Sequence, residues 1–172
     1  MTLVLGIEDK GSVVLASDSF IGDDDHHDVL DGPKWFRLGR VTVGWAGSPA
    51  VAKVIESSTK VPTRARGERT PAYLFRLLQA AHTAVTNSDL KFEDASIILA
   101  YSGRVYSVVD GRAPIRSAHG YAAIGSAEIP ALVALALTAG GEDVEARARS
   151  VMEGAGRHCA QVKQPYYIHR FR

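Results

Sequence analysis

Three polar residues in the first fifth of the chain could together carry out nucleophilic catalysis. Thr2 follows the initiator methionine, Asp18 follows an apolar run, and Lys34 precedes another. A hydroxyl is a poor nucleophile until a base takes its proton, and the α-amine of an N-terminal threonine can be that base because its unperturbed pKa is ~7.7–8.0. A nearby lysine ammonium lowers the pKa of both groups, and a carboxylate keeps the lysine charged and in place.

The expected strands explain how these three residues could meet. Residues 2–7 and 13–16 are apolar and separated by a short Gly-containing turn, which predicts a β-hairpin. A hairpin returns its second strand to the starting end, so Asp18 can lie beside Thr2. An acidic, irregular loop over residues 22–32 can then bring a strand at 34–38 to the same edge, and a strand at 41–45 follows.

Taken singly, each residue has a simpler interpretation. A threonine at position 2 is common, Asp18 is typical of a turn, and Lys34 is typical of a solvated strand end. Ser126 is well placed as a helix N-cap, while Gly44 and Gly47 could merely ease a strand-to-helix crossing. Only the joint spacing of Thr2, Asp18 and Lys34 favours a site.

The rest of the chain alternates strand runs with pairs of helices. Capping and periodicity predict helices at 49–58, from Thr70-Pro71 to about 85, at 126–139 and at about 142–159. Strands are expected at 95–101, 104–109, 120–124 and 165–171. This order does not suit a parallel βαβ sheet. It favours one α+β domain over residues 1–172, in which two antiparallel sheets pack face to face and helix pairs cover their outer faces.

Composition excludes several classes of protein. With 172 residues, 46% of them hydrophobic, the chain is long and apolar enough for one core. Twenty basic against 19 acidic residues give a net charge of +1, which argues against nucleic-acid binding. The single Cys159 cannot form an internal disulfide, and the longest apolar run, 129–139, is too short to span a bilayer. No signal-peptide pattern opens the chain. We therefore expect a soluble, cytoplasmic protein with no membrane partner.

Several segments resemble the proteasome β-subunit family of the N-terminal nucleophile hydrolases. They are VVLASDS, DGPKWF, VTVGWAG and YAAIGSAEIPALVALAL, and they are most similar to the small bacterial HslV-type members. The resemblance covers residues 2–60 and 94–140 and fades after about 150. It implies a four-layer αββα sandwich and a threonine endopeptidase that forms an acyl-enzyme on Thr2 after Met1 is removed.

The resemblance also implies a role for each matching residue. Thr2 is the nucleophile and, through its amine, the base, with Lys34 as electrostatic activator and Asp18 as the partner of Lys34. Gly44 offers its N–H to the oxyanion, and Ser126 helps to relay the proton of the amine. The implied substrate cleft is lined by Phe20, Ile21, Gly22 and Gly47.

The resemblance further implies a ring-shaped homo-oligomer that cleaves unfolded polypeptides or peptides and needs no metal or organic cofactor. An ATP-dependent unfoldase is a candidate partner under the same resemblance. Two features depart from the family. His158 and Gln161 stand where an Asp and a Ser usually support the site, and a retained Met1 would block the amine. Two alternatives follow: a non-catalytic proteasome-like structural or assembly protein, and an amidase of the same superfamily acting on a non-peptide amide.

The acidic stretch at residues 23–28 invites a metal-site interpretation. Its carboxylates and histidines lack the spacing of an EF-hand and match no zinc pattern. A solvated acidic loop is the better interpretation, and a loop of this charge at the edge of a cleft would favour basic side chains in the substrate.

Overall fold

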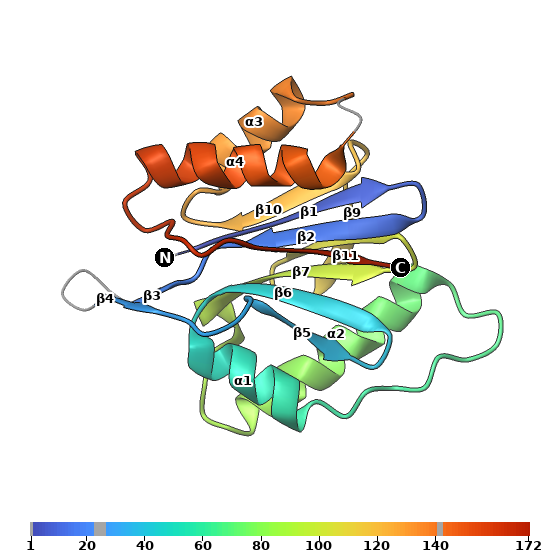
Figure 1. Ribbon diagram of the computed structural model, residues 1–172. Coiled ribbons are helices and arrows are strands. Elements are labelled where there is room, and N and C mark those ends of the chain that lie inside the picture. The colour runs from blue at the N-terminus through green and yellow to red at the C-terminus, as the bar shows by residue number, and fades with distance from the viewer. Residues whose placement is uncertain (1, 23–26, 141–142) are drawn as a thin grey trace.

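The computed structural model describes residues 2–22, 27–140 and 143–172 (Figure 1). Met1, residues 23–26 of the acidic stretch and residues 141–142 lie outside these ranges. Among the described residues, the chain is α+β, and the strand neighbours pair antiparallel in two larger sheets and one short hairpin. The predicted α+β class with antiparallel sheets is therefore confirmed.

The first sheet contains both ends of the described chain. Its strand order is β10-β1-β2-β11, formed by Tyr121–Gly125, Leu3–Asp9, Ser12–Ser17 and Tyr167–Phe171. The β1–β2 hairpin turns at Lys10 and Gly11, which both have positive φ. This confirms the predicted hairpin, and it places Thr2 and Asp18 at the same end of the sheet.

The second sheet holds the strand that follows Lys34. Its order is β5-β6-β7-β8-β9, formed by Trp35–Leu38, Val41–Gly47, Ala95–Tyr101, Arg104–Val109 and Ala113–Arg116. The short strand β9 was not expected from the sequence. Neither was the hairpin of β3 (Phe20–Gly22) and β4 (His27–Val29), most of which falls in the segment predicted to be irregular.

Helix pairs cover the two sheets from outside (Figure 1). Helices α1 (Pro49–Ser58) and α2 (Thr70–Thr86) pack on the five-stranded sheet, and a 3-10 turn at Phe92–Asp94 leads into β7. Helices α3 (Glu128–Leu137) and α4 (Val144–His158) pack on the four-stranded sheet.

A third apolar cluster lies between the two sheets. Along β6, Val43 and Trp45 face the helices, whereas Ala46 faces the other sheet. Both faces of this strand are therefore buried.

Helix α3 begins later than predicted. Its N-cap residue is Ala127, which makes no side-chain cap, and Ser126 lies exposed in the preceding turn. The predicted capping role of Ser126 is therefore wrong. The physical reason is that Ala127 is fully buried in the core beneath α3, which carries Ser126 out to solvent.

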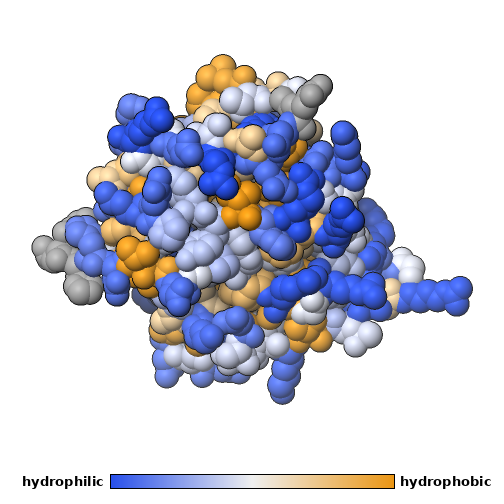
Figure 2. Space-filling model, viewed as in Figure 1, coloured by the Kyte–Doolittle hydropathy of each residue, from blue (hydrophilic) through white to orange (hydrophobic). Residues whose placement is uncertain are grey.

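The outer face of α3 is apolar. Ile129, Val133 and Leu137 recur at helical spacing and are 74%, 54% and 82% exposed, whereas Ala131 and Leu135 are buried. Figure 2 shows the resulting apolar surface at the top of the molecule. Within the described ranges, no helix combines the length and apolar character needed to cross a membrane.

Gly125 is the glycine on which the position of Thr2 depends. It has φ +104, and a Cβ there would lie 2.0 Å from the carbonyl oxygen of Thr2. We expect Gly125→Ala to lower the free energy of unfolding by about 1–3 kcal/mol more than Gly11→Ala, because overpacking is added to backbone strain. Gly11 is the matched control, since it has φ +86 and open space around it. Urea unfolding of both variants tests this, and equal losses would contradict it.

Candidate active site

Three segments meet at one end of the two sheets. Asp18 directly follows β2, and its N–H donates to the carbonyl of Leu3 at 3.2 Å. Lys34 precedes β5, where its N–H donates to Ser17 Oγ at 3.1 Å and its carbonyl accepts from Trp45 N at 3.0 Å. The backbone thus brings Lys34, directly before β5 of one sheet, next to the end of β2 in the other.

The side chains of Thr2, Asp18 and Lys34 contact one another. Thr2 Oγ1 donates to Asp18 Oδ1 at 2.5 Å and accepts a hydrogen bond from Lys34 Nζ. Lys34 Nζ also donates to Asp18 Oδ1 at 2.8 Å and to the carbonyl of Phe20 at 2.5 Å. The exposed fractions of the three residues are 4%, 0% and 1%. The structure therefore brings together the three residues that spacing had grouped.

The contacts of Lys34 indicate its charge state. Its three acceptors match the three N–H donors of an ammonium, whereas a neutral amine has only two. Burial lowers the pKa of Lys34 below its ordinary value, and the adjacent Asp18 carboxylate opposes this by favouring the charged form. An ammonium beside Thr2 Oγ1 would stabilise an alkoxide at that oxygen if the hydroxyl lost its proton.

Backbone donors hold the carboxylate of Asp18. Leu3 N donates to Oδ1 at 3.0 Å and Phe20 N donates to Oδ2 at 3.0 Å, while Lys163 N approaches Oδ2 at 3.5 Å. The carbonyl of Lys163 in turn accepts from both the N–H and the hydroxyl of Ser19. Sequence analysis missed Lys163, and because it acts through main-chain groups, its residue type gives no signal.

A small pocket of about 50 Å³ opens beside Thr2 and Lys34. Trp45 and Pro49 line this pocket. So do all four residues that were predicted to line the substrate cleft, which are Phe20, Ile21, Gly22 and Gly47. Gly47 has φ +96, and a Cβ there would lie 2.3 Å from the carbonyl oxygen of Asp94. Any other residue at position 47 would therefore shift the backbone that forms this wall.

Gly44 does not lie in this pocket. It sits in the middle of β6, between Trp35 and Ile98, where a Cβ would lie within 3.0 Å of both Ile98 and Val4 side chains. Trp45 N donates towards β5, and since N–H directions alternate along a strand, the Gly44 N–H points towards β7. Its position serves packing between the sheets.

Ser126 lies next to the site. It follows Gly125, which packs directly on the backbone of Thr2. Between these described residues, no hydrogen bond joins Ser126 to Thr2. Ser126 is exposed at the end of β10, so its side chain faces solvent.

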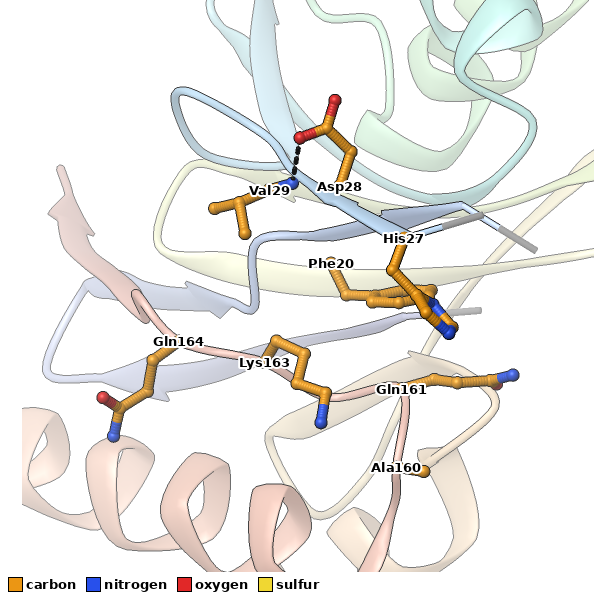
Figure 3. A pocket seen from close by; sticks show the side chains of 8 residues that line it. All are labelled: Phe20, His27, Asp28, Val29, Ala160, Gln161, Lys163 and Gln164. Atoms are coloured by element: carbon orange, nitrogen blue, oxygen red, sulfur yellow. Dashed lines mark hydrogen bonds between the residues drawn. The ribbon is translucent and has the colours of Figure 1, made fainter. Parts of the chain in front are cut away.

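Phe20 also lines a larger pocket of about 830 Å³ (Figure 3). One wall is the β3–β4 hairpin, in which the rings of Phe20 and His27 lie 5.3 Å apart, and the other is the segment from Ala160 to Gln164. Gln161 lines this pocket, whereas His158 is exposed at the end of α4.

The metal-site interpretation of the acidic stretch concerns mostly residues 23–26, outside the described range. His27 and Asp28 are described and line the larger pocket. Across the described part of the chain, no three His, Cys, Asp or Glu residues are grouped so that they could hold a metal ion.

The fold is similar to several solved structures. They include Thiobacillus denitrificans BPH in complex with epoxomicin (TM-score 0.81, 19% identity, 99% of this chain and 98% of that chain). They also include eukaryotic HslV from Trypanosoma brucei (TM-score 0.78, 21% identity, 98% of each chain). Another is Anbu, the ancestral beta-subunit, from Yersinia bercovieri (TM-score 0.74, 14% identity, 98% of this chain and 81% of that chain).

No family model and no curated protein matches the chain. The membership of an HslV-type family therefore stays a prediction, and at these identities the likeness concerns the fold alone. The chain therefore shares the proteasome-like fold of BPH, HslV and the Anbu ancestral beta-subunit.

Proposed function

We propose that this chain is a proteasome-type threonine peptidase with a four-layer αββα fold, which cleaves peptide bonds through an acyl-enzyme on Thr2. The observation that carries the proposal is the buried contact of Thr2 Oγ1 with Lys34 Nζ and Asp18 Oδ1 at the wall of an open pocket. A structural role alone does not require a buried ion pair, because an apolar core of similar volume is often at least as stable.

The reaction divides into two steps. Removal of Met1 frees the α-amine of Thr2, which takes the proton of Oγ1 while the Lys34 ammonium stabilises the developing alkoxide. Oγ1 attacks the peptide carbonyl, and the resulting intermediate expels the amine product, which leaves with that proton. Water, deprotonated by the same α-amine, then attacks the ester on Thr2, and breaking of the ester bond releases the acid product and restores the hydroxyl.

We assign the oxyanion donor to Gly47 rather than to Gly44. Gly47 lines the pocket with Thr2, whereas the N–H of Gly44 points into the sheet. A backbone N–H aimed at the oxyanion stabilises the transition state by about 3–4 kcal/mol. Ser126, which follows Gly125, then supports the position of Thr2 and makes no hydrogen bond to it in the described structure.

The neighbouring pockets favour a peptide over a small amide as substrate. The Thr2 pocket shares Phe20 with the 830 Å³ pocket, and it shares Trp45 and Pro49 with another pocket of about 450 Å³. An extended chain across Thr2 would contact both neighbours, which a small acylated amide would not reach.

The exposed face of α3 supports self-association. Three large apolar side chains on one helix face, Ile129, Val133 and Leu137, are typical of a protein interface. We propose a ring homo-oligomer that acts on unfolded polypeptides in the cytoplasm, with an ATP-dependent unfoldase as a candidate partner.

Intact mass with a peptide epoxyketone tests the proposed nucleophile. The probe adds to both the hydroxyl and the free amine of an N-terminal threonine, so we expect loss of Met1 and one adduct of the full probe mass. Thr2→Ala should abolish the adduct, because it removes the hydroxyl. Thr2→Ser keeps a hydroxyl and an amine, and should retain the adduct at a lower rate.

Retained Met1 with no adduct would instead indicate the non-catalytic alternative. An adduct combined with hydrolysis of small acylated amides, but of no peptide in a fluorogenic panel, would indicate the amidase.

The pH dependence of kcat/KM tests the role of Lys34. If the ammonium is the active form, kcat/KM falls as pH rises through the pKa of Lys34, which burial places below the ordinary lysine value. In Asp18→Asn the attraction that raises this pKa is lost, so the alkaline fall should begin at lower pH than in the wild type. Asp89→Asn, the same change at an exposed position, should leave the alkaline limb in place. An alkaline limb that is unmoved in Asp18→Asn would refute the assigned role.

A further inference from the structure

Two side-chain hydroxyls of the first sheet bind the segment that carries Lys34 into β5. Ser17 Oγ accepts a hydrogen bond from the N–H of Lys34 at 3.1 Å, and the hydroxyl oxygen of Tyr167 accepts one from the N–H of Gly32 at 3.1 Å. Pro33, which lies between them, has no N–H. Every backbone N–H of this short segment is therefore bound by a side chain of β2 or β11.

Ser17 and Tyr167 can act together because they are directly opposite in the β2–β11 ladder. Directly paired residues have their side chains on the same face of a sheet. Val4, the β1 partner of Ser17, belongs to the apolar cluster between the two sheets. The two hydroxyls therefore lie on the face that is turned towards the second sheet, which contains β5.

Backbone pairing cannot hold the Lys34 segment to the first sheet. Strand β5 pairs with β6 of its own sheet, and β2 is already paired on both sides, with β1 and β11. Only side chains can cross from β2 and β11 to this segment. A ring contact follows the two hydrogen bonds, since Trp35 lies edge-on against Phe171 with ring centroids 6.0 Å apart. The residues on both sides of Lys34 are thus held against β11.

Successive residues at the end of β2 hold the two ends of Lys34. Ser17 binds its backbone N–H, and Asp18 Oδ1 accepts from its Nζ at 2.8 Å. A lysine side chain is a charge on a flexible four-carbon stem, so the place of Nζ is well defined only when the backbone is fixed as well. Fixing both ends is what the contact of Nζ with Thr2 Oγ1 requires.

We propose that the hydroxyls of Ser17 and Tyr167 form a clamp that positions Lys34 for the reaction at Thr2. Among the described residues, no hydrogen bond joins either hydroxyl to Thr2, so both are positioning residues. This inference rests on the proposed peptidase function. Lys34 is 1% exposed, so loss of the Ser17 hydroxyl would leave a buried N–H without an acceptor. The segment can satisfy that donor only by moving, and Nζ then moves with it.

Ser17→Ala tests the clamp through kcat. For a fluorogenic peptide we expect kcat to fall about three- to tenfold and KM to change less than about twofold, because one hydrogen bond is lost while the lining of the Thr2 pocket is kept. Active sites are counted by epoxyketone labelling, so a loss of folded protein does not lower the measured kcat.

Ser12→Ala is the matched control for this change. Ser12 is buried on the same strand, and its hydroxyl donates to the carbonyl of Asp9 at the opposite end of the sheet. Its kcat should equal that of the wild type even where the free energy of unfolding falls. An unchanged kcat in Ser17→Ala, or an equal fall in Ser12→Ala, would overturn the proposal.

Tyr167→Phe removes the second hydroxyl and keeps the ring. We expect a smaller fall in kcat, about two- to fivefold, because the N–H of Gly32 also donates to the carbonyl of Leu30 at 3.1 Å. Tyr101→Phe is its control, since that hydroxyl accepts from Arg64 at 2.9 Å, and it should keep the wild-type kcat. A wild-type kcat in Tyr167→Phe would contradict the role of Tyr167.

The double variant Ser17→Ala/Tyr167→Phe tests whether the two hydroxyls act as one unit. Both hold the same segment, so the double variant should lose less kcat than the product of the two single losses. Losses that simply multiply would indicate two independent contacts and would contradict a clamp.

Amide hydrogen exchange separates the clamp from the peptidase function, because it needs no substrate. We expect slow exchange at Gly32 and Lys34 in the wild type, and exchange at Lys34 about tenfold faster in Ser17→Ala. Fast exchange at both amides in the wild type would overturn the clamp and leave the peptidase function standing. Slow exchange in a wild-type chain that the epoxyketone does not label would contradict the peptidase function, and the two hydroxyls would then only tie the sheets together.

Discussion

The contact of Lys34 with Asp18 is the interaction on which the site depends. Burial of an ion costs several kcal/mol even after relaxation, so the pair persists only where it is fully hydrogen-bonded. Here Lys34 Nζ reaches three acceptors, and Asp18 accepts from backbone N–H groups at Leu3 and Phe20. Because Asp18 directly follows β2 of one sheet and Lys34 directly precedes β5 of the other, the pair also joins the two sheets beside Thr2.

Close packing between the sheets sets where that pair can form. A Cβ at Gly6 would lie 2.8 Å from Val105 of the opposite sheet, and one at Gly44 would lie 3.0 Å from Val4. Both glycines let the sheets approach at their centre, and this fixes the separation at the edge where Lys34 must reach Thr2. Gly44, to which the family resemblance gave the role of oxyanion donor, therefore lies where the absence of a side chain lets the two sheets pack together.

Sequence reasoning succeeded where local rules determine the outcome. The Gly-containing turn and two apolar runs predicted the β1–β2 hairpin, and that hairpin was enough to place Thr2 beside Asp18. It failed where tertiary packing decides. Burial of Ala127 moved the start of α3 past Ser126, and the alternation of N–H directions along β6 separated Gly44 from Gly47. The sequence reveals neither the burial of Ala127 nor the N–H directions along β6, because both depend on which segments pack or pair together in the fold.

The segment after α4 shows why the type of a residue does not reveal whether that residue holds Asp18 in place. The sequence has His158 and Gln161 where the family usually has an Asp and a Ser, and this raised the alternative of a non-catalytic protein. Yet what reaches Asp18 and Ser19 from this segment is the backbone of Lys163. A main-chain N–H and carbonyl are the same for almost any residue, so the side chains there can change while the surroundings of Asp18 stay constant. The departure from the family pattern is therefore weak evidence against the proposed catalysis, because the Lys163 backbone contacts Asp18 and Ser19 whichever side chains stand at positions 158 and 161.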